Sequence, residues 1–327
     1  MRVILTTRFY KNGQTTHVTD LCTELMRQGH QVLLIINHLH DPPYARWLQE
    51  TMIPHVTTTE LGKLKKSIHR LLPQPHIIHN HSVRTLPLAN TLGKIFQIPK
   101  VTTVHYLDFD ANLLCTQDAV ISISQEMQAQ LKKLGITSHV IENGVRIPKQ
   151  LSTRNTWKKA ALFLAQVTPA KEANFRQMTE SLLDWGWTIT SAGNWSHRGV
   201  TAHGWINDVG AVLRDSDLVI GSGRAVRQAM AWGKPAWVLG TYSDGLVTPE
   251  NIVQLEETNF SGRFSKQPFS RSKASVYLEN PSPKEMQELG HFGRRHATEQ
   301  FSIERMVKKL VLIYESCLLK SSGEKET

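Results

Sequence analysis

Two glycine-containing turns carry the residue types needed to bind an anion. Gly13 follows the apolar run that opens the chain, and Gly221, Ser222 and Gly223 follow the run DLVI. A glycine between a strand and a helix lets backbone N–H groups approach a phosphate, and the helix N-terminus adds about half a positive charge. The alternative for each turn is a tight bend that needs glycine only for a positive φ. We expect both turns to lie at anion-binding sites.

Arg224 comes directly after the second of these turns. Its planar guanidinium group presents a fork of N–H donors that fits a phosphate or a hydroxyl group. The alternative is an exposed residue in the first turn of a helix. Arg224 is therefore a candidate catalytic residue beside the second glycine turn.

Histidines are the other side chains suited to chemistry. His79 and His81 lie two residues apart in a strand-like run, so they share a face, and His76 is close in sequence. This spacing is compatible with a metal pair, but no Cys, Asp or Glu nearby completes a ligand set, so we expect no metal. His105 ends the run KVTTVH, where a neutral imidazole can donate to and accept from hydroxyl groups. A packed or solvent-facing histidine is the alternative there.

Hydrophobic periodicity predicts alternating strands and helices in the first half of the chain. An apolar strand at 2–6, a helix over 18–26 and a buried strand at 31–37 form a βαβ unit of about 36 residues. The strand-like runs HIIHNH, KVTTVH and AVISIS follow, and Ser124 and Gly135 fit the two ends of a further helix. This order is typical of a doubly wound parallel sheet.

The same alternation repeats after VIENGVRIP, where an Asn-Gly turn and a proline interrupt the pattern. The strand-like runs ALFLAQV, TITSAG, DLVIGSG and AWVLG alternate with helical segments, and a long amphipathic helix is predicted over 302–319. A chain of 327 residues is also long for a single core. We therefore predict two Rossmann-like α/β domains facing across a cleft, at 1–147 and 148–327, with the option that the last helix packs on the first domain.

Several of these segments, in this order, resemble the retaining GT-B glycosyltransferases of family 4. The stretch NGQTTHVTDLCTELMRQGHQV is similar to the glycine loop and first helix of that family, PHIIHNHS to its D-x-[IV]-H-x-H strand, and VIENGV to its hinge. In the second half, AQVTPAK is similar to the family's G-R-x-x-x-x-K motif and RQAMAWGKP to its EAMAxGxP motif. The resemblance spans nearly the whole chain and implies an enzyme that uses a nucleotide-diphosphate sugar.

The resemblance also implies roles for individual residues. Lys171 matches the lysine that holds the donor pyrophosphate, where an ammonium group would offset charge building on the leaving diphosphate; an exposed loop lysine is the alternative. Trp205 lies where the family lines the nucleobase site, although a core tryptophan is the alternative. Gly193, the glycine turn that ends TITSAG, is a further donor-binding candidate. His105 matches a histidine that contacts the donor sugar or the acceptor.

Two donor-site positions depart from the family pattern. The family carries two glutamates seven residues apart, but here the second is Gln228 and the first would fall on Ile220 inside a strand. Gln166 stands where an arginine precedes the phosphate lysine. A glutamine accepts hydrogen bonds without the roughly twofold strength of a carboxylate, and it cannot neutralise a phosphate. The sequence therefore predicts a weaker or differently built donor site.

The resemblance implies a retaining mechanism that needs neither a metal nor a protein general base. In this mechanism the departing phosphate itself takes the proton of the acceptor, so charge stabilisation is the main requirement on the protein. Lys171, Arg224 and backbone amides could supply it without the missing glutamates.

Composition excludes several other classes of protein. A net charge of +10 and a pI near 9.5 indicate an anionic partner, but no nucleic-acid-binding module is recognisable, so we expect no nucleic acid. The three cysteines are far apart and odd in number, which does not suggest a disulfide framework. Neither a signal peptide nor a stretch of about 18 apolar residues is present, so we expect a cytoplasmic protein.

A basic segment at 61–72, LGKLKKSIHRLL, places apolar residues at helical spacing among lysines and an arginine. It could lie on an anionic membrane surface, where a lipid-linked acceptor would be found. A solvated basic face on an ordinary surface helix is the alternative.

We therefore expect a glycosyltransferase that moves a sugar, with retention, from a nucleotide-diphosphate sugar to a glycan, lipid-linked or small-molecule acceptor, as in glycan or cell-envelope biosynthesis. The main alternative is a catalytically silent homologue that binds a sugar nucleotide or partners an active enzyme, as Gln166 and Gln228 suggest. Sugar-nucleotide epimerisation on the same fold is a third possibility.

Overall fold

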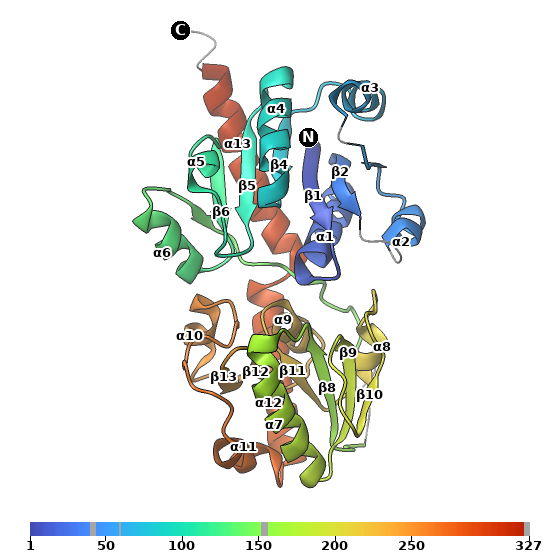
Figure 1. Cartoon of the computed structure of the whole chain (residues 1–327), viewed down its shortest axis with the longest axis vertical. Coiled ribbons are helices and arrows are strands. Elements are labelled where there is room, and N and C mark those ends of the chain that lie inside the picture. The colour runs from blue at the N-terminus through green and yellow to red at the C-terminus, as the bar shows by residue number, and fades with distance from the viewer. Residues whose placement is uncertain (40–43, 59, 152–155, 324–327) are drawn as a thin grey trace. The chain divides into compact units, whose positions relative to one another are not determined.

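The computed structural model describes residues 1–39, 44–58, 60–151 and 156–323, and these form two compact units (Figure 1). Unit 1 comprises residues 1–144 together with the C-terminal helix that starts at Ile303, and unit 2 comprises Val145–Ser302. The division after Gly144 lies close to the sequence boundary at 147. The last helix belongs to unit 1 by its contacts, although it follows unit 2 in the chain.

The elements of unit 1, in chain order, are β1 (Arg2–Phe9), α1 (Gly13–Arg27), β2 (Gln31–Leu39), α2 (Tyr44–Glu50), β3 (His55–Val56), α3 (Leu61–Leu71), β4 (Ile77–Asn80), η1 (Val83–Thr85), α4 (Leu86–Phe96), β5 (Lys100–Val104), α5 (Ala111–Leu114), β6 (Ala119–Ser122), α6 (Gln125–Lys133), β7 (His139–Val140) and α13 (Ile303–Gly323). The described strands form one sheet in the order β3-β2-β1-β4-β5-β6-β7, and every pairing is parallel. The order reverses between β1 and β4, which is the switch point of a doubly wound sheet.

The elements of unit 2 are β8 (Ala160–Ala165), α7 (Pro169–Asp184), β9 (Thr188–Gly193), β10 (Val200–Ala202), α8 (Gly210–Arg214), β11 (Leu218–Gly221), α9 (Arg224–Ala231), β12 (Ala236–Leu239), β13 (Ser243–Leu246), α10 (Ile252–Glu257), α11 (Arg271–Leu278) and α12 (Pro283–Gln300). The described strands form a sheet in the order β10-β9-β8-β11-β12-β13, with its switch point between β8 and β11. β13 pairs antiparallel with β12 and was not predicted from the sequence. The predicted fold of two Rossmann-like α/β domains is confirmed.

Local sequence signals set several helix ends. The Asn12 side chain accepts a hydrogen bond from the Thr15 amide and caps α1. Ser124 caps α6 by accepting from the Met127 amide, and Gly135 ends that helix with φ of 76°, as its sequence predicted. Asn12 and Ser124 fix loops at the carboxyl edge of the sheet, so these two caps also orient the candidate site.

The apolar face of α3 is part of the unit 1 core. Leu64, Ile68 and Leu72 are buried in one cluster with Ile4 and Leu33 of the sheet. Burial of each such side chain contributes about 1.5–3 kcal/mol. Packing on the sheet therefore accounts for most of the amphipathic pattern of 61–72, while Leu61 and Leu71 are exposed beside the basic residues. Among the described residues, no helix is both long and apolar enough to cross a membrane.

Helix α13 is fixed to the centre of unit 1 by a buried hydrogen bond. The Tyr314 hydroxyl lies 2.6 Å from Nδ1 of His79 on β4, and the other ring nitrogen of His79 lies 2.7 Å from Oγ1 of Thr103 on β5. All three side chains are buried. The C-terminal helix is thus tied to two central strands through polar groups that water cannot reach.

Replacing Tyr314 by Phe should destabilise the protein by about 1–3 kcal/mol, because the ring stays while Nδ1 of His79 loses its partner in a buried place. The free energy of unfolding, measured by guanidinium titration, checks this expectation. Tyr277→Phe is the matched control, since that side chain is exposed and should change stability by less than about 0.5 kcal/mol. Equal effects of the two substitutions would contradict the anchoring role.

Candidate functional site

Ligands of doubly wound sheets bind outside the carboxyl ends of the strands, at the point where strand order reverses. In unit 1 this place is formed by the residues that follow β1 and β4, and in unit 2 by those that follow β8 and β11. Each of the predicted site residues lies at, or close to, the carboxyl edge of one of these two sheets. Gly13 and His105 belong to unit 1, and the other predicted residues belong to unit 2.

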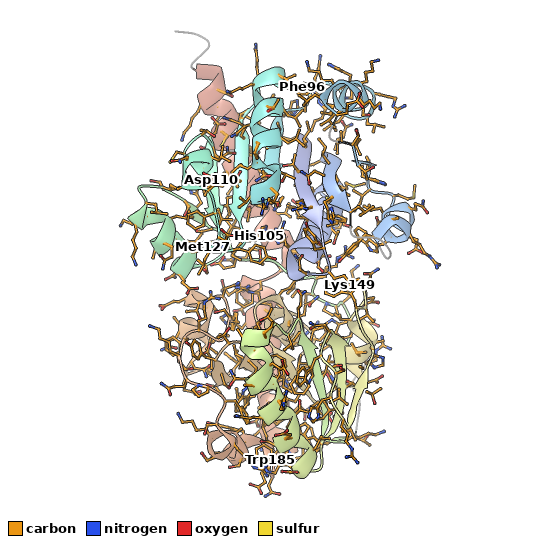
Figure 2. All side chains as sticks on the ribbon, viewed as in Figure 1. Phe96, His105, Asp110, Met127, Lys149 and Trp185 are labelled. Atoms are coloured by element: carbon orange, nitrogen blue, oxygen red, sulfur yellow. The ribbon has the colours of Figure 1, made fainter. Side chains whose placement is uncertain are left out.

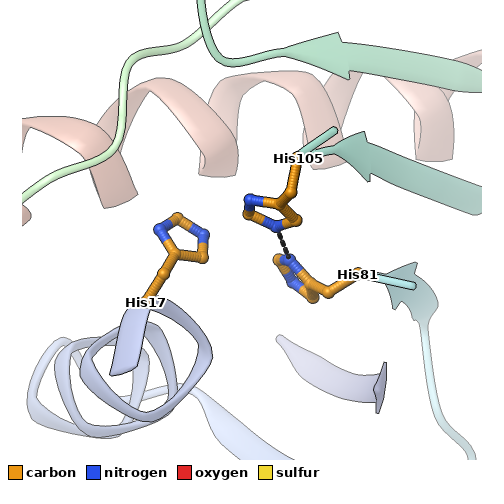
Figure 3. A group of neighbouring side chains, drawn as sticks. All are labelled: His17, His81 and His105. Atoms are coloured by element: carbon orange, nitrogen blue, oxygen red, sulfur yellow. Dashed lines mark hydrogen bonds between the residues drawn. The ribbon is translucent and has the colours of Figure 1, made fainter. Parts of the chain in front are cut away.

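Three histidine rings converge at the switch point of unit 1 (Figure 3). His17 projects from α1, His81 follows β4 and His105 follows β5, where Figure 2 also marks it. Nδ1 of His81 lies 3.1 Å from Nε2 of His105, and the His17 ring centroid lies 5.5 Å from that of His81 and 4.9 Å from that of His105. Gln14 holds the strand end in place by donating to the His81 carbonyl over 2.6 Å.

The cluster differs from the histidine group considered in the sequence. His79 is committed to Tyr314 and Thr103 through its two ring nitrogens, and His76 bonds to Arg2 at the opposite end of the strand. His17 completes the cluster instead, and the sequence analysis missed it. The signal that could have found His17 is its place one turn into the helix after β1, which points its ring toward the switch point.

Burial keeps the imidazoles of His79, His81 and His105 neutral. It lowers the pKa of His79 and of His105 to about 3, and it lowers the pKa of His81 well below its usual value, with neighbouring histidines adding to the effect. Nε2 of His81 has no hydrogen-bond partner among the described residues. A neutral imidazole offers one donor and one acceptor, so the cluster is suited to bind hydroxyl groups.

The same three rings are the described residues best placed to hold a metal ion. Their ligand nitrogens all lie within 4.8 Å of one another. Two imidazole nitrogens on one zinc ion can be at most about 4.2 Å apart, because each Zn–N bond is about 2.1 Å. Nδ1 of His81 and Nε2 of His105, at 3.1 Å, already lie within that limit.

Lys171 of unit 2 lies in the first turn of α7, just beyond the carboxyl end of β8. Its ammonium donates to the carbonyl oxygen of Gln166 over 3.2 Å, and the side chain is half-buried. Burial lowers the pKa of Lys171, and the nearby charge of Arg263 lowers it further. The dipole of a helix disfavours a cation in its first turn, so a bound anion would relieve all three effects.

Close backbone approach, rather than a ligand, explains two of the predicted glycines. A Cβ at Gly193, where φ is 132°, would lie 1.9 Å from the carbonyl oxygen of Ala165. A Cβ at Gly221 would lie 2.5 Å from the carbonyl oxygen of Leu164. Both positions therefore require glycine so that β9 and β11 can lie against β8, and this packing also brings the strand ends of the candidate donor site together.

The Gly221–Gly223 turn leads directly into α9. Gly223 has φ of 61°, and its N–H donates to the carbonyl oxygen of Phe260 over 2.7 Å. This N–H is thus used within the protein, so the turn has less backbone capacity for an anion than its glycines suggested. Arg224 and Gln228 are half-buried and lie one helical turn apart, which places them on the same face of α9.

The remaining predicted donor residues flank this edge. Gln166 is exposed directly after β8, and Gly13 is the exposed first residue of α1 in unit 1. Gly193 donates to the carbonyl of Gly204 over 2.8 Å, which brings the following Trp205 toward the end of β9. Trp205 is half-buried and its indole N–H donates to Asn207 over 3.3 Å, so it is not a core residue.

Comparisons with known proteins agree with this geometry. Residues 11–147 match the family model Glycosyltransferase Family 4. The structure of Anabaena HepE with UDP and glucose matches at a TM-score of 0.68 and 15% identity, over 97% of this chain and 100% of HepE. S. aureus TarM with Fondaparinux, alpha-GlcNAc-glycerol and UDP matches at 0.67 and 12%, over 96% and 100%. Sucrose-phosphate synthase from Thermosynechococcus elongatus matches at 0.65 and 14%, over 98% and 100%.

No curated protein matches the chain by sequence. The chain nevertheless has the GT-B fold over nearly its whole length, and residues 11–147 match the model of Glycosyltransferase Family 4. The resemblance stated from the sequence motifs is confirmed at this level.

The buried histidines should make the protein less stable in acid. The unfolded chain takes up a proton on each imidazole below about pH 6.5, whereas folded His79 does so only near pH 3, so stability falls as the pH drops through this window. His79 alone should contribute a loss of about 2 kcal/mol between pH 7 and pH 5. His79→Gln should therefore show a smaller difference in unfolding free energy between these pH values than the wild type. The exposed His203→Gln is the control, and an unchanged pH dependence in His79→Gln would contradict the account.

Proposed function

We propose that this chain transfers a sugar from a nucleoside-diphosphate donor to a hydroxyl group of a glycan, lipid-linked or small-molecule acceptor, with retention of configuration. Unit 2 binds the donor and unit 1 binds the acceptor. The observation that carries the proposal is the half-buried Lys171 at the β8 strand end, where burial and the nearby charge of Arg263 lower its pKa. Such a site favours a diphosphate, because the negative charge of the diphosphate pairs with the positive charge of the lysine.

Uridine is the nucleoside that we propose for the donor. HepE and TarM have UDP bound in their structures, and both share the fold over nearly the whole of this chain. Trp205, half-buried beyond the end of β10, offers a ring on which a base can stack. The identity of the sugar is left open by these features.

The proposed reaction balances without a protein base. The bond between the anomeric carbon and the donor phosphate oxygen breaks, and the acceptor oxygen bonds to the same face of that carbon. The acceptor proton moves to the departing phosphate oxygen. Lys171 and Arg224 stabilise the negative charge that develops on the diphosphate, and the neutral His105 binds a sugar or acceptor hydroxyl.

No metal is needed in this proposal. Protein cations stabilise the negative charge on the leaving diphosphate, and the neutral histidines His81 and His105 of unit 1 act through hydrogen bonds to hydroxyl groups. Because the proposed donor and acceptor chemistry needs only nucleotide sugars and glycans, we also propose that the protein acts in the cytoplasm.

A catalytically silent homologue is the second candidate, and Gln166 and Gln228 favour it. Neither glutamine carries the charge of the residue it replaces in the family pattern. Such a protein would bind a sugar nucleotide and transfer nothing to any acceptor. Incubation with UDP-sugars and a panel of glycan acceptors, with release of UDP as the readout, separates the two candidates.

Lys171→Ala should weaken UDP binding about 10- to 100-fold, since a hydrogen bond to a charged group contributes about 1.5–3 kcal/mol. Thermal unfolding with increasing UDP measures this, because a ligand at 100 times its Kd stabilises the native state by about 2.7 kcal/mol. Lys284→Ala is the matched control, since Lys284 is also a lysine in the first turn of a helix that begins with proline, but it is exposed.

The same titration with EDTA present tests the proposal that no metal takes part. Equal stabilisation by UDP with and without EDTA is expected. Loss of stabilisation in EDTA would contradict the metal-free proposal, and equal UDP binding by Lys171→Ala and Lys284→Ala would remove Lys171 from the donor site.

For a lipid-linked acceptor we propose that the basic outer face of α3 contacts an anionic membrane. Lys65, Lys66 and Arg70 are exposed there, on the side opposite the buried Leu64 and Ile68. Each basic residue near an anionic surface contributes about 1 kcal/mol. The contact would therefore be electrostatic and reversible.

Cosedimentation with phosphatidylserine vesicles tests this contact. Reversing the charges of Lys65 and Lys66 to Glu should weaken vesicle binding more than about tenfold. The control reverses Lys132 and Lys133, an adjacent exposed pair on α6. Equal binding by both double variants, or no binding of the wild type, would argue against the membrane contact.

A further inference from the structure

A five-residue segment of unit 2, Asn259–Arg263, runs from the glycine turn of the candidate donor site toward Lys171. At its start, the Gly223 N–H donates to the carbonyl oxygen of Phe260 over 2.7 Å, and the Arg227 guanidinium donates to the side-chain oxygen of Asn259. The segment is therefore bonded to both the turn before α9 and the helix itself. It follows α10 and carries no motif that marked it in the sequence.

Arg227 holds this end of the segment rigidly. Its side chain is wholly buried, and its guanidinium carbon lies 5.2 Å from the Phe260 ring centroid and 4.7 Å from that of Phe301. Cation–π contacts of a desolvated arginine contribute about 2 kcal/mol. Arg227 therefore stabilises the position of the segment and is too deeply buried to bind a phosphate.

The other end of the segment is fixed to the loop after β12. Tyr242 donates through its N–H to the carbonyl oxygen of Gly262 over 3.1 Å. Gly262 has φ of 75°, and a Cβ there would lie 2.7 Å from the backbone nitrogen of Gly240 and from the carbonyl oxygen of Tyr242. Asp244 accepts from the amide of Ser265 over 2.8 Å just beyond the segment. The backbone on both sides of Arg263 is thus closely held.

The same loop is attached to the helix that carries Lys171. The buried Asn174, one turn after Lys171 on α7, donates to the carbonyl oxygen of Thr241 over 2.7 Å and accepts from the amide of Phe269 over 2.9 Å. Residues 241 and 269 bracket the loop that holds Gly262. One hydrogen-bonded network therefore joins the helix that carries Lys171 to the segment that carries Arg263.

Placing two cations near each other has an electrostatic cost that a bound anion would reduce. Lys171 and Arg263 are both half-buried, and the charge of Arg263 adds to burial in lowering the pKa of Lys171. A perturbed pKa with a specific charged neighbour marks a candidate functional site, and a phosphate would pair with both cations. Gln166, the position from which the family pattern would supply an arginine, is uncharged.

We propose that Arg263 is the second phosphate-binding cation of the donor site, and that it acts with Lys171 in place of the arginine absent at position 166. This inference rests on the proposed function, because it assigns the diphosphate of the donor to that site. Arg263 binds the phosphate oxygens through its planar fork, and Lys171 binds them as a point charge.

Isothermal titration with UDP and with uridine tests the proposal. Arg263→Gln should raise the Kd for UDP about 10- to 100-fold and leave the Kd for uridine unchanged, since uridine has no phosphate. Arg263→Lys keeps the charge and should lose less affinity than Arg263→Gln. Arg198→Gln, which changes an exposed arginine elsewhere in unit 2, is the matched control and should bind UDP as the wild type does.

The outcomes separate the inference from the proposed function. If the wild type binds UDP and Arg263→Gln binds it equally well, the role of Arg263 is overturned and the proposed function stands. If the wild type binds neither UDP nor another nucleoside diphosphate, both are overturned. Equal loss of UDP and uridine binding would assign Arg263 a structural role and would also overturn the proposal. Thermal unfolding of each variant without ligand shows that it is folded.

Discussion

The need to hold positive charge at a strand end, partly out of water, is the constraint on which unit 2 depends. Lys171 lies where burial, a neighbouring arginine and the dipole of its own helix all oppose a protonated ammonium. The surrounding structure is correspondingly rigid. Asn174, the buried Arg227 and two glycines in close backbone contact fix the loops around it. In the proposed function, a bound diphosphate would offset the electrostatic cost of this arrangement.

Unit 1 uses the opposite electrostatic strategy at the equivalent edge of its sheet. Burial keeps His81 and His105 uncharged, so these side chains are suited to hydrogen bonding and not to charge pairing. The same sheet topology therefore presents a neutral polar surface in one unit and a cationic one in the other. The neutral edge of unit 1 is suited to a sugar hydroxyl and the cationic edge of unit 2 to a phosphate. Transfer from a nucleotide sugar needs a site of each kind.

Local patterns made much of this architecture predictable. The strand and helix order, the Ser124 cap and the place of Lys171 after β8 were all read from short stretches of sequence. β13 was missed because its short run SDGL has no strand periodicity. His17 and Arg263 were missed because their neighbours come from distant parts of the chain, His81 in one case and Lys171 in the other. The contact of Arg263 leaves no mark in local spacing, whereas the place of His17 one turn into the helix after β1 is a local signal that could have found it.

Hydrogen–deuterium exchange with and without UDP tests the central claim that the donor diphosphate binds at the carboxyl edge of unit 2. The account predicts that UDP slows amide exchange in peptides covering 166–174, 221–228 and 259–263, because binding suppresses local opening there. Peptides around 77–82 and 100–105 of unit 1 should be much less affected. Protection confined to those unit 1 peptides, or none at any UDP concentration, would contradict it.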